Sequence, residues 1–454
     1  MERDGAPRPR VALAAFGRAT FDLAQAEAVL ARSRRALEAL PLDLVAAPDG
    51  LLTDPQAAGA FGGRCAAEAP DVVIAQLTTF VDARLPVALA EALPPGVPLL
   101  LWALREPGAP GERLSLNSLT GCNLAGHELG RRGRFFRFVL GDPGEEAVGA
   151  RALALGRAAA ACRWLRGFRV LILGDAPDGF FFGNPSEDGA RALNLHLERL
   201  PLADLFAAAG AVAEADWRAA VEDVRDRVAG LDRLPGAQIE RFGRVRAVVE
   251  REVAARGAQA VAVRCWPEFF TDFGAAACSF VSALNERGVA ASCEADVLGA
   301  LSMGLLSRLS GGAPYLGDLC ACDAERDAAV FWHCGAGAFS LAAGGARAGV
   351  HPNRGLGFTL EFALKPGRVT IARLGEAPGG GLRLLLGGGE ALDAPQRFLG
   401  TAATVRLDGP GPVQATVARL IEEAWEPHYA LVYGDVRPEV ADVAAMLHLP
   451  VRAL

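Results

Sequence analysis

The segments RVALAAF (residues 10–16), LAQAEAVLARSRRALEAL (residues 23–40) and DVVIA (residues 71–75) decide the fold at the start of this chain. The first and third are short apolar runs of the length expected for buried strands, whereas the second repeats its apolar residues with a helical period. Buried strands that alternate with amphipathic helices are typical of a parallel sheet covered by helices. We therefore predict a doubly wound α/β domain here.

The alternation continues and then changes along the chain. Further helices are expected at 86–93, 117–131, 217–256, 273–287 and 294–309, and further strands at 97–102, 135–140, 168–173, 258–264 and 329–333. From residue 344, glycine-punctuated alternation indicates antiparallel strands at 357–364, 368–374 and 382–386, followed by helix 414–425, strand 430–433 and helix 438–447. We predict two doubly wound α/β domains, residues 1–165 and 166–343, followed by a β-rich, barrel-like domain, residues 344–454.

Composition excludes several classes of protein. The 454-residue chain is 51% hydrophobic and 22% charged, as in globular proteins, and its net charge of -7 gives no basic surface for a nucleic acid. No apolar run reaches the roughly 18 residues of a membrane span, and the first ten residues lack the apolar core of a secretory signal. Nine scattered cysteines do not indicate a disulfide framework. We expect a cytoplasmic protein with no membrane partner.

The turn after the strand at 168–173 is Gly174-Asp-Ala-Pro-Asp-Gly179. It lacks the Gly-x-Gly-x-x-Gly spacing with which a helix N-terminus cradles a dinucleotide. We interpret it as an ordinary strand-to-loop turn and expect no organic cofactor.

Residues that carry chemistry gather where predicted strands end or helices begin. They occur in Cys265-Trp-Pro-Glu268, Cys293-Glu-Ala-Asp-Val297, Gly317-Asp318, Trp332-His-Cys-Gly335 and Pro427-His428. In open α/β sheets ligands bind at the carboxyl ends of strands, so these side chains are expected to converge on one cleft. Carboxylate oxygens with imidazole nitrogens suit Mn²⁺, Mg²⁺ or Fe²⁺ better than a structural Zn²⁺. The pattern indicates an open catalytic metal site.

The segment from Arg264 to Leu341 resembles the L-fucose isomerase and L-arabinose isomerase superfamily of metal-dependent aldose–ketose isomerases. Sequence similar to that of the superfamily recurs at residues 117–121, at Gly126-His127, at residues 365–370, and at His428 with Gly434-Asp435. The resemblance covers most of the chain, and Glu294-x-Asp296 with Trp332-His-Cys-Gly335 are its more specific parts.

The resemblance implies a set of roles for the site. Glu294, opening a helix, and Asp318, ending the next strand, would bind the metal and transfer the substrate proton, while His428 would complete the site. His333 resembles a further histidine that only arabinose-type members use as a ligand, so it would contact either metal or substrate. The expected ion is Mn²⁺, or another divalent metal such as Mg²⁺, Fe²⁺ or Co²⁺, in a homo-oligomer with active sites near subunit interfaces.

Other residues are candidate sugar-binding groups. Trp266 and Glu268 face the substrate or only anchor a strand end, His351 lines the pocket, and Arg18 is placed where the family can send an arginine to a neighbouring subunit's sugar. Arg18 and Arg264 are the arginines to test if the substrate is anionic, because guanidinium groups bind oxyanions in a fixed geometry.

Each site residue also has a purely structural interpretation. Glu294 is alternatively an acid that stabilises a helix N-terminus, Asp318 a turn residue, His428 a loop residue and His333 a core histidine. A zinc cluster is a further alternative, but its Cys-x-Cys spacing is not the usual one; it would use Cys320, Cys322, His333 and Cys334.

We expect interconversion of an aldose and a ketose through an ene-diolate, with a free pentose, deoxyhexose or modified hexose as substrate. The alternatives are an isomerase of a sulfonated sugar such as sulfoquinovose, a non-catalytic sugar-binding protein with this fold, and a metal-dependent hydrolase.

Overall fold

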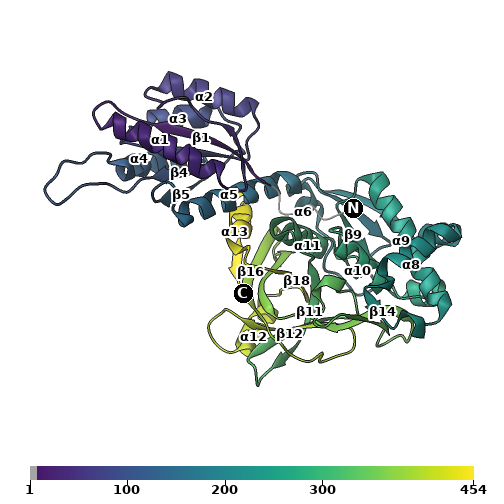
Figure 1. Cartoon of the computed structure of the whole chain (residues 1–454). Helices are drawn as coiled ribbons and strands as arrows, with labels where there is room; N and C mark the ends of the chain where they lie inside the picture. The colour runs from purple at the N-terminus through teal and green to yellow at the C-terminus, as the bar shows by residue number, and fades with distance from the viewer. Residues whose placement is uncertain (1–7) are drawn as a thin grey trace. The chain divides into compact units, whose positions relative to one another are not determined.

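The computed structural model describes residues 8–454 and divides into two compact units, residues 6–163 and 164–454 (Figure 1). The part of the N-terminal segment up to residue 7, for which we expect no secretory signal, lies outside the described residues. No helix from residue 8 onwards is both long and apolar enough to cross a bilayer. All nine cysteines are free thiols.

The N-terminal unit contains a five-stranded parallel sheet in the order β2-β1-β3-β4-β5. Its strands are β1 (Arg10–Phe16), β2 (Asp43–Ala46), β3 (Val72–Leu77), β4 (Leu99–Ala103) and β5 (Phe136–Leu140). Its helices are α1 (Leu23–Glu38), α2 (Pro55–Ala67), α3 (Arg84–Glu91), α4 (Ser118–Arg131) and α5 (Glu146–Leu165).

Strand β1 is buried on both faces, which explains its unbroken apolar sequence. Ala12, Ala14 and Phe16 belong to the core shared with α2, α3 and α4. Val11 and Leu13 belong to the opposite core, shared with α1 and α5. The sheet is therefore doubly wound, as predicted.

The second unit begins with a parallel sheet in the order β10-β9-β6-β7. Its strands are β6 (Arg169–Leu173), β7 (His196–Leu200), β9 (Ala260–Val263) and β10 (Ala290–Ser292). The accompanying helices are α6 (Glu187–Ala192), α7 (Leu202–Gly210), α8 (Glu214–Arg225), η1 (Leu231–Arg233), α9 (Gly236–Arg256), η2 (Phe269–Phe273), α10 (Cys278–Glu286) and α11 (Val297–Ser310).

The rest of this unit is a β-rich layer with a closed barrel in the order β16-β15-β18-β11-β12-β17, which closes because β16 also pairs with β17. Its strands are β11 (Tyr315–Asp323), β12 (Ala328–His333), β15 (Gly367–Glu376), β16 (Leu382–Ala391), β17 (Thr401–Leu407) and β18 (His428–Tyr433). Strands β14 (Gly357–Ala363), β13 (Ala346–Val350), β8 (Val228–Ala229) and β19 (Val451–Ala453) extend the sheet, with η3 (Phe339–Leu341), α12 (Val413–Glu422) and α13 (Arg437–Met446) beside it.

The predicted fold class is confirmed: two parallel α/β sheets precede a C-terminal β-rich part. Strands β11 and β12 precede residue 344 and nevertheless belong to the barrel. The domain boundaries at 165 and 343 stay predictions.

Several elements of the structure differ from the expected ones. The helix expected over 217–256 is two helices, α8 and α9, because Gly230 adopts a left-handed conformation after the short strand β8. The helix expected from Phe273 begins at Cys278, after the left-handed Gly274. Strand β2 and helix α2 were not expected at all, because β2 is only four residues long and α2 contains glycines.

Helix α11 connects the two layers of the second unit. It is apolar around most of its circumference because it contacts β9 and β10 on one side and β15 and β18 on the other. The turn at its N-terminus is therefore held between the parallel sheet and the barrel, and this turn carries Glu294 and Asp296.

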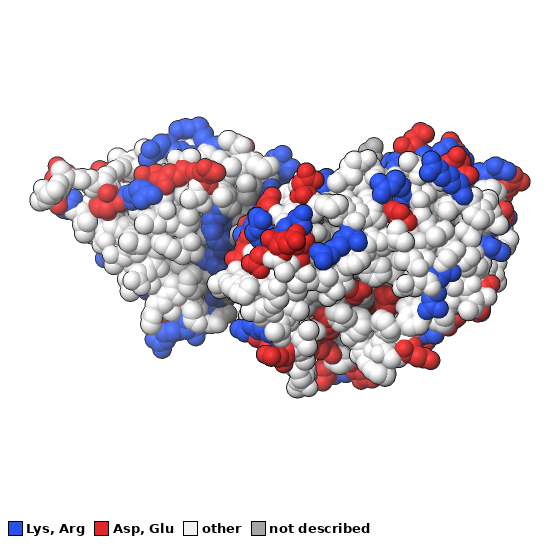
Figure 2. All heavy atoms as spheres, turned by 90° about the horizontal axis from the view of Figure 1, so that it is seen from below, with Lys and Arg blue, Asp and Glu red and all other residues white. Residues whose placement is uncertain are grey.

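The exposed surface carries charges of both signs, interspersed on the face shown in Figure 2. Arg368, Asp408, Asp435 and Arg437 form one ion-pair network at the surface, in which Arg437 Nη1 lies 2.8 Å from Asp408 Oδ2. Exposed pairs contribute only about 0–1 kcal/mol each. The family-like segments at residues 365–370 and 434–435 thus supply surface ion pairs.

Candidate active site

Glu294 lies in a left-handed turn between β10 and α11. Its φ is 53° and that of Ala295 is 56°, a conformation that side chains with a Cβ rarely adopt. Two such residues in succession indicate a functional constraint. The helix begins later, at Val297, and its cap is Asp296, which accepts from the Gly299 N–H at 2.7 Å. The expectation that Glu294 opens the helix is therefore wrong.

One oxygen of Glu294 is fixed by neighbours from the segment after β9. Its Oε1 accepts from the Cys265 thiol at 3.4 Å and from the Trp266 indole N–H at 3.3 Å. These two contacts orient the carboxylate so that the other oxygen, Oε2, faces the histidines. Within residues 8–454, neither Oε2 nor the facing His333 Nε2 has a hydrogen-bond partner.

Two histidines from the barrel face that free oxygen. His333, the last residue of β12, places Nε2 3.6 Å from Glu294 Oε2, and His428, the first residue of β18, places Nε2 3.5 Å away. The ligand atoms of all three residues lie within 4.8 Å of one another. They form a group that could hold a metal ion.

Asp318 lies beside this group. It is paired with His428 across β11 and β18, and its Oδ1 is 3.4 Å from His428 Nε2. About a third of its side chain is exposed, so it is the most accessible acid of the cluster. It is inside β11 and not at the strand end where we expected it, because β11 continues to Asp323 around the barrel.

A buried pair behind His428 sets the orientation of its ring. Asp296 Oδ2 lies 2.9 Å from His428 Nδ1 and also accepts from Arg373 Nη1. Asp296 and Arg373 are fully buried. Because a carboxylate can only accept, His428 donates from Nδ1 and keeps the lone pair of Nε2 directed toward Glu294 and Asp318. This carboxylate–histidine pair is the arrangement that supports metal ligands in many enzymes.

The electrostatics of the cluster follow from its burial and its charges. Burial alone would raise the pKa of Glu294, but His333 and His428, when protonated, lower it to about 2. Burial likewise opposes ionisation of Asp296, but Arg373 and His428 hold its pKa well below the usual value.

A pocket of about 220 Å³ opens onto Glu294 and His333. It is smaller than the roughly 300–1,000 Å³ typical of pockets for drug-sized ligands, so it suits one small molecule. The hairpin loop between β13 and β14 lines it with His351, Asn353 and Arg354. Burial lowers the pKa of His351 to about 4, so this ring is neutral at pH 7.

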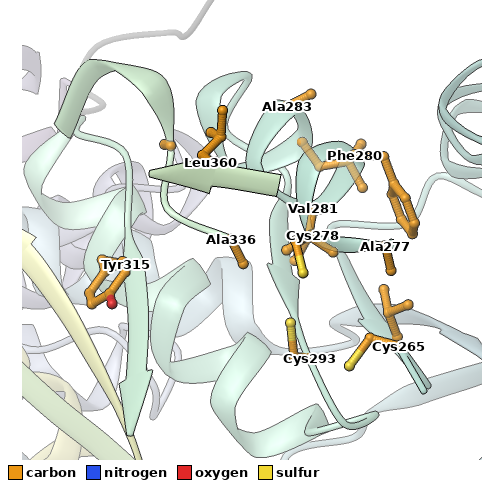
Figure 3. Packing of buried hydrophobic residues seen from close by; sticks show 14 of the residues in the cluster. Cys265, Ala277, Cys278, Phe280, Val281, Ala283, Cys293, Tyr315, Ala336 and Leu360 are labelled. Carbon is orange, nitrogen blue, oxygen red and sulfur yellow. The ribbon is translucent and has the colours of Figure 1, made fainter. Parts of the chain in front are cut away.

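Cysteines form much of the remaining wall: Cys265, Cys278, Cys293 and Cys334. Figure 3 shows the sulfur atoms of Cys278 and Cys293 facing each other, with Cys265 beside them. Burial raises the pKa of Cys278, and a hydrogen bond with Cys265 together with burial raises that of Cys293, both well above the usual value. These two thiols are neutral.

Of the four residues predicted to bind substrate, two line the pocket and two do not. Trp266 lines the pocket, as does His351. Glu268 does not, because Arg264 holds its carboxylate through two hydrogen bonds of 2.8 Å. Arg18 is an exposed residue of the N-terminal unit, with its guanidinium 5.8 Å from the Phe80 ring centroid.

The zinc-cluster alternative is not what the structure shows. The groups that could hold a metal, searched over residues 8–454, contain neither Cys320 nor Cys322. Cys320 is exposed and contacts the Val330 carbonyl at 3.4 Å.

Sequence reasoning missed a pair of aromatic residues from the loop after β6. The Phe182 ring lies 5.1 Å from the His428 ring, and the Phe180 ring lies 5.3 Å from the Trp266 ring, both edge to face. Three consecutive phenylalanines between Gly179 and Gly183 in an otherwise polar loop were the available signal.

Comparison with known proteins identifies the class. The chain is 42% identical to a sulfoquinovose isomerase of Alkalicoccus urumqiensis over 89% of this chain and 90% of that protein. Sulfoquinovose isomerases of Priestia megaterium and Clostridium sp. are 38% and 35% identical, over 96% and 97% of this chain and 96% and 98% of their own lengths. No family model matches.

The fold, the acid–histidine site and these relatives together define an aldose–ketose isomerase. The chain belongs to the sulfoquinovose isomerase family.

Proposed function

We propose that the protein interconverts sulfoquinovose, a glucose whose terminal hydroxyl is replaced by sulfonate, and the corresponding 2-ketose. The observation that carries this proposal is the identity of 35–42% to sulfoquinovose isomerases over nearly the whole chain. Of our two expectations for the substrate, the comparisons favour the sulfonated sugar over a free pentose or deoxyhexose.

The proposed chemistry moves a proton between C1 and C2 of the open-chain sugar through an ene-diolate. Glu294, whose Oε2 is free of hydrogen bonds in the described chain and borders the pocket, removes the proton from one carbon. Asp318 lies on β11, beside His428 of β18, and is partly exposed. It accepts the proton from one substrate hydroxyl and returns it to the oxygen on the neighbouring carbon. Glu294 then returns a proton to the neighbouring carbon, and exchange of this proton with solvent before its return is what the deuterium test below detects.

The residues present fit a divalent ion. Bonds of ~2.1 Å place neighbouring ligand atoms about 3.0 Å apart in an octahedron and about 3.4 Å apart in a tetrahedron. His428 Nε2 is 3.5 Å from Glu294 Oε2 and 3.4 Å from Asp318 Oδ1, longer than good hydrogen bonds and close to these separations. When bound, Mn²⁺ or a similar ion would act as a Lewis acid that stabilises the negative charge of the ene-diolate.

The two histidines have different roles in this proposal. His428 donates from Nδ1 to Asp296, which leaves Nε2 as a ligand. His333 instead accepts at Nδ1 from the Cys334 N–H at 3.0 Å, so a neutral ring carries its proton on Nε2, facing Glu294. We infer that Glu294, Asp318 and His428 hold the metal and that His333 donates a hydrogen bond to Glu294 or to a sugar oxygen.

We further propose that the family lies within the L-fucose and L-arabinose isomerase superfamily, and that the protein is a cytoplasmic homo-oligomer with active sites near subunit interfaces. In such an oligomer Arg18 could reach the sugar of a neighbouring subunit. Equilibrium sedimentation of the full-length protein tests the oligomer, and a monomer at all concentrations would contradict it.

The test of the activity is incubation of the full-length protein with Mn²⁺ and sulfoquinovose in deuterated water, followed by NMR. We expect the 2-ketose to form and deuterium to enter at C2 of the recovered aldose, with both signals lost after chelation. Conversion of neutral pentoses or deoxyhexoses without any conversion of sulfoquinovose would contradict the proposal. Binding of sugars without exchange would instead favour a non-catalytic sugar-binding protein.

A further inference from the structure

A sulfonate stays negatively charged at every physiological pH, whereas the centre of the candidate site is acidic. Glu294 lines one side of the pocket, and the walls add Cys265, Cys278, Cys293 and Cys334 with His333 and His351. A sugar that carries a permanent negative charge therefore needs a cation at the far end of the same pocket. Among the described residues that line this pocket, Arg354 is the only arginine, and lysine is absent.

Backbone hydrogen bonds and two aromatic rings hold Arg354 in place. It lies on the tight loop between β13 and β14, where its own N–H and that of Gly355 donate to the His351 carbonyl at 3.1 and 2.9 Å. Its guanidinium lies 5.5 Å from the Trp266 ring centroid and 5.7 Å from that of Phe270. Aromatic faces attract the cation and orient the planar group while its N–H donors remain available.

No carboxylate in the described part of the chain lies within ion-pair distance of Arg354. Two other arginines near the site, Arg264 and Arg373, are by contrast bound to carboxylates. Arg264 is engaged by both oxygens of Glu268 and by the Ala176 carbonyl at 2.7 Å. Arg373 is fully buried and bound to Asp296. Of the arginines that residues 8–454 place near the site, only Arg354 offers an unpaired guanidinium to a molecule in the pocket.

We propose that Arg354 binds the sulfonate of the substrate and so selects sulfonated over neutral sugars. This inference rests on the proposed function, because it assigns the anionic end of that substrate. Trp266 links the two ends of the site, since its ring lies beneath Arg354 and its indole N–H holds Glu294 Oε1. A sulfonate at Arg354 thus directs the opposite end of the sugar, C1 and C2, toward Glu294.

The test compares variants of the full-length enzyme with Mn²⁺ on sulfoquinovose and on quinovose, which has a methyl group in place of the sulfonated carbon. We expect Arg354→Gln to raise KM for sulfoquinovose about 10- to 100-fold with kcat changed less than about threefold, because a charge-assisted contact is lost. The ratio of kcat/KM for sulfoquinovose to that for quinovose falls by a similar factor. Arg354→Lys restores part of the affinity.

Arg347→Gln is the matched control, because Arg347 is exposed on the same hairpin and donates to Gln396 at 2.9 Å, away from the pocket. Its KM for sulfoquinovose stays at the wild-type value. Calorimetric titration of the metal-free protein with sulfoquinovose gives a second readout, in which Arg354→Gln weakens binding.

Three results would overturn the inference while leaving the proposed function intact: an unchanged KM in Arg354→Gln, an equal loss of activity on both sugars, or a raised KM in Arg18→Gln alone. A wild-type enzyme that does not convert sulfoquinovose at all refutes the proposed function, and this inference with it.

Discussion

The two units bury their polar side chains in different ways. In the described part of the N-terminal unit the buried polar groups are neutral apart from Asp71, which pairs with Arg163. Those neutral groups are Ser33, Gln76, Thr78, Thr79 and Ser118. The second unit buries a connected set of ionisable side chains: Glu294, Asp296, His333, Arg373 and His428.

The difference shows where the protein places energetically costly chemistry. A buried charge loses its hydration, and only partners at good distance offset that loss. In the first unit, one hydrogen bond offsets the lost hydration of each neutral polar group. In the second unit, the lost hydration of each buried charge is offset only by a group of opposite charge. Substitutions that remove one member should therefore have graded effects, largest in the acid–histidine cluster and smallest in the N-terminal sheet.

The largest effect is expected for Glu294→Gln. The amide keeps the shape of the side chain but cannot accept a proton from carbon, so kcat should fall by at least about 10³-fold. Initial rates of isomerisation measure this, and circular dichroism shows that the fold is retained. A variant that keeps more than a tenth of the wild-type rate would contradict the expectation that the acid–histidine cluster gives the largest effect.

Next comes Arg373→Met, which removes the cation that compensates the fully buried Asp296. We expect a loss of about 3–5 kcal/mol in the free energy of unfolding, measured by chemical denaturation. The matched change in the other unit is Arg163→Gln, because Arg163 is 60% exposed although its partner Asp71 is buried. A loss in Arg163→Gln as large as that in Arg373→Met would erase the proposed difference between the units.

A smaller effect is expected for Asp296→Asn. The amide no longer carries the charge that fixes the His428 ring, so affinity for Mn²⁺ should fall about 10- to 100-fold. Isothermal titration of the chelator-treated protein with Mn²⁺ checks this. Affinity equal to the wild-type value would mean that His428 is not oriented through Asp296.

The smallest effect is expected for Ser33→Ala. Gln76 Nε2 donates to Ser33 Oγ at 2.7 Å, and its loss leaves a buried amide unpaired, at a cost of about 1–3 kcal/mol. Isomerase rates at temperatures below unfolding should match the wild type. A changed kcat would contradict this and would show that the core of the N-terminal unit influences the rate of isomerisation.

Much of the fold could be predicted because its signals are local. Strand β1 was expected at its observed bounds, since both of its faces are buried and every position is apolar after Arg10. Helix α11 was instead expected to begin at Glu294, because nothing in the sequence shows that Glu294 and Ala295 adopt left-handed conformations. That turn depends on the two layers between which α11 is held.

The site could be predicted only as far as residue chemistry reaches. Glu294, Asp318, His333 and His428 are predicted because acids and imidazoles occur at strand ends and helix starts and because the family resemblance implies their roles. The structure brings these four side chains together. Arg373 was missed, since its partner Asp296 is 77 residues away in the sequence and only barrel closure joins them. Arg354 was missed because an arginine in a turn is normally a solvated surface residue.

Strand β18 has a consequence for how the protein is made. It begins with His428 and follows both β11 and β15 in the sequence, yet it lies between them in the sheet. Until the ribosome releases these residues, β11 and β15 each lack a neighbour and present open edges that can pair with other chains. The nascent polypeptide also lacks the candidate metal ligand His428 until then, so the candidate site forms only after β18 has been made.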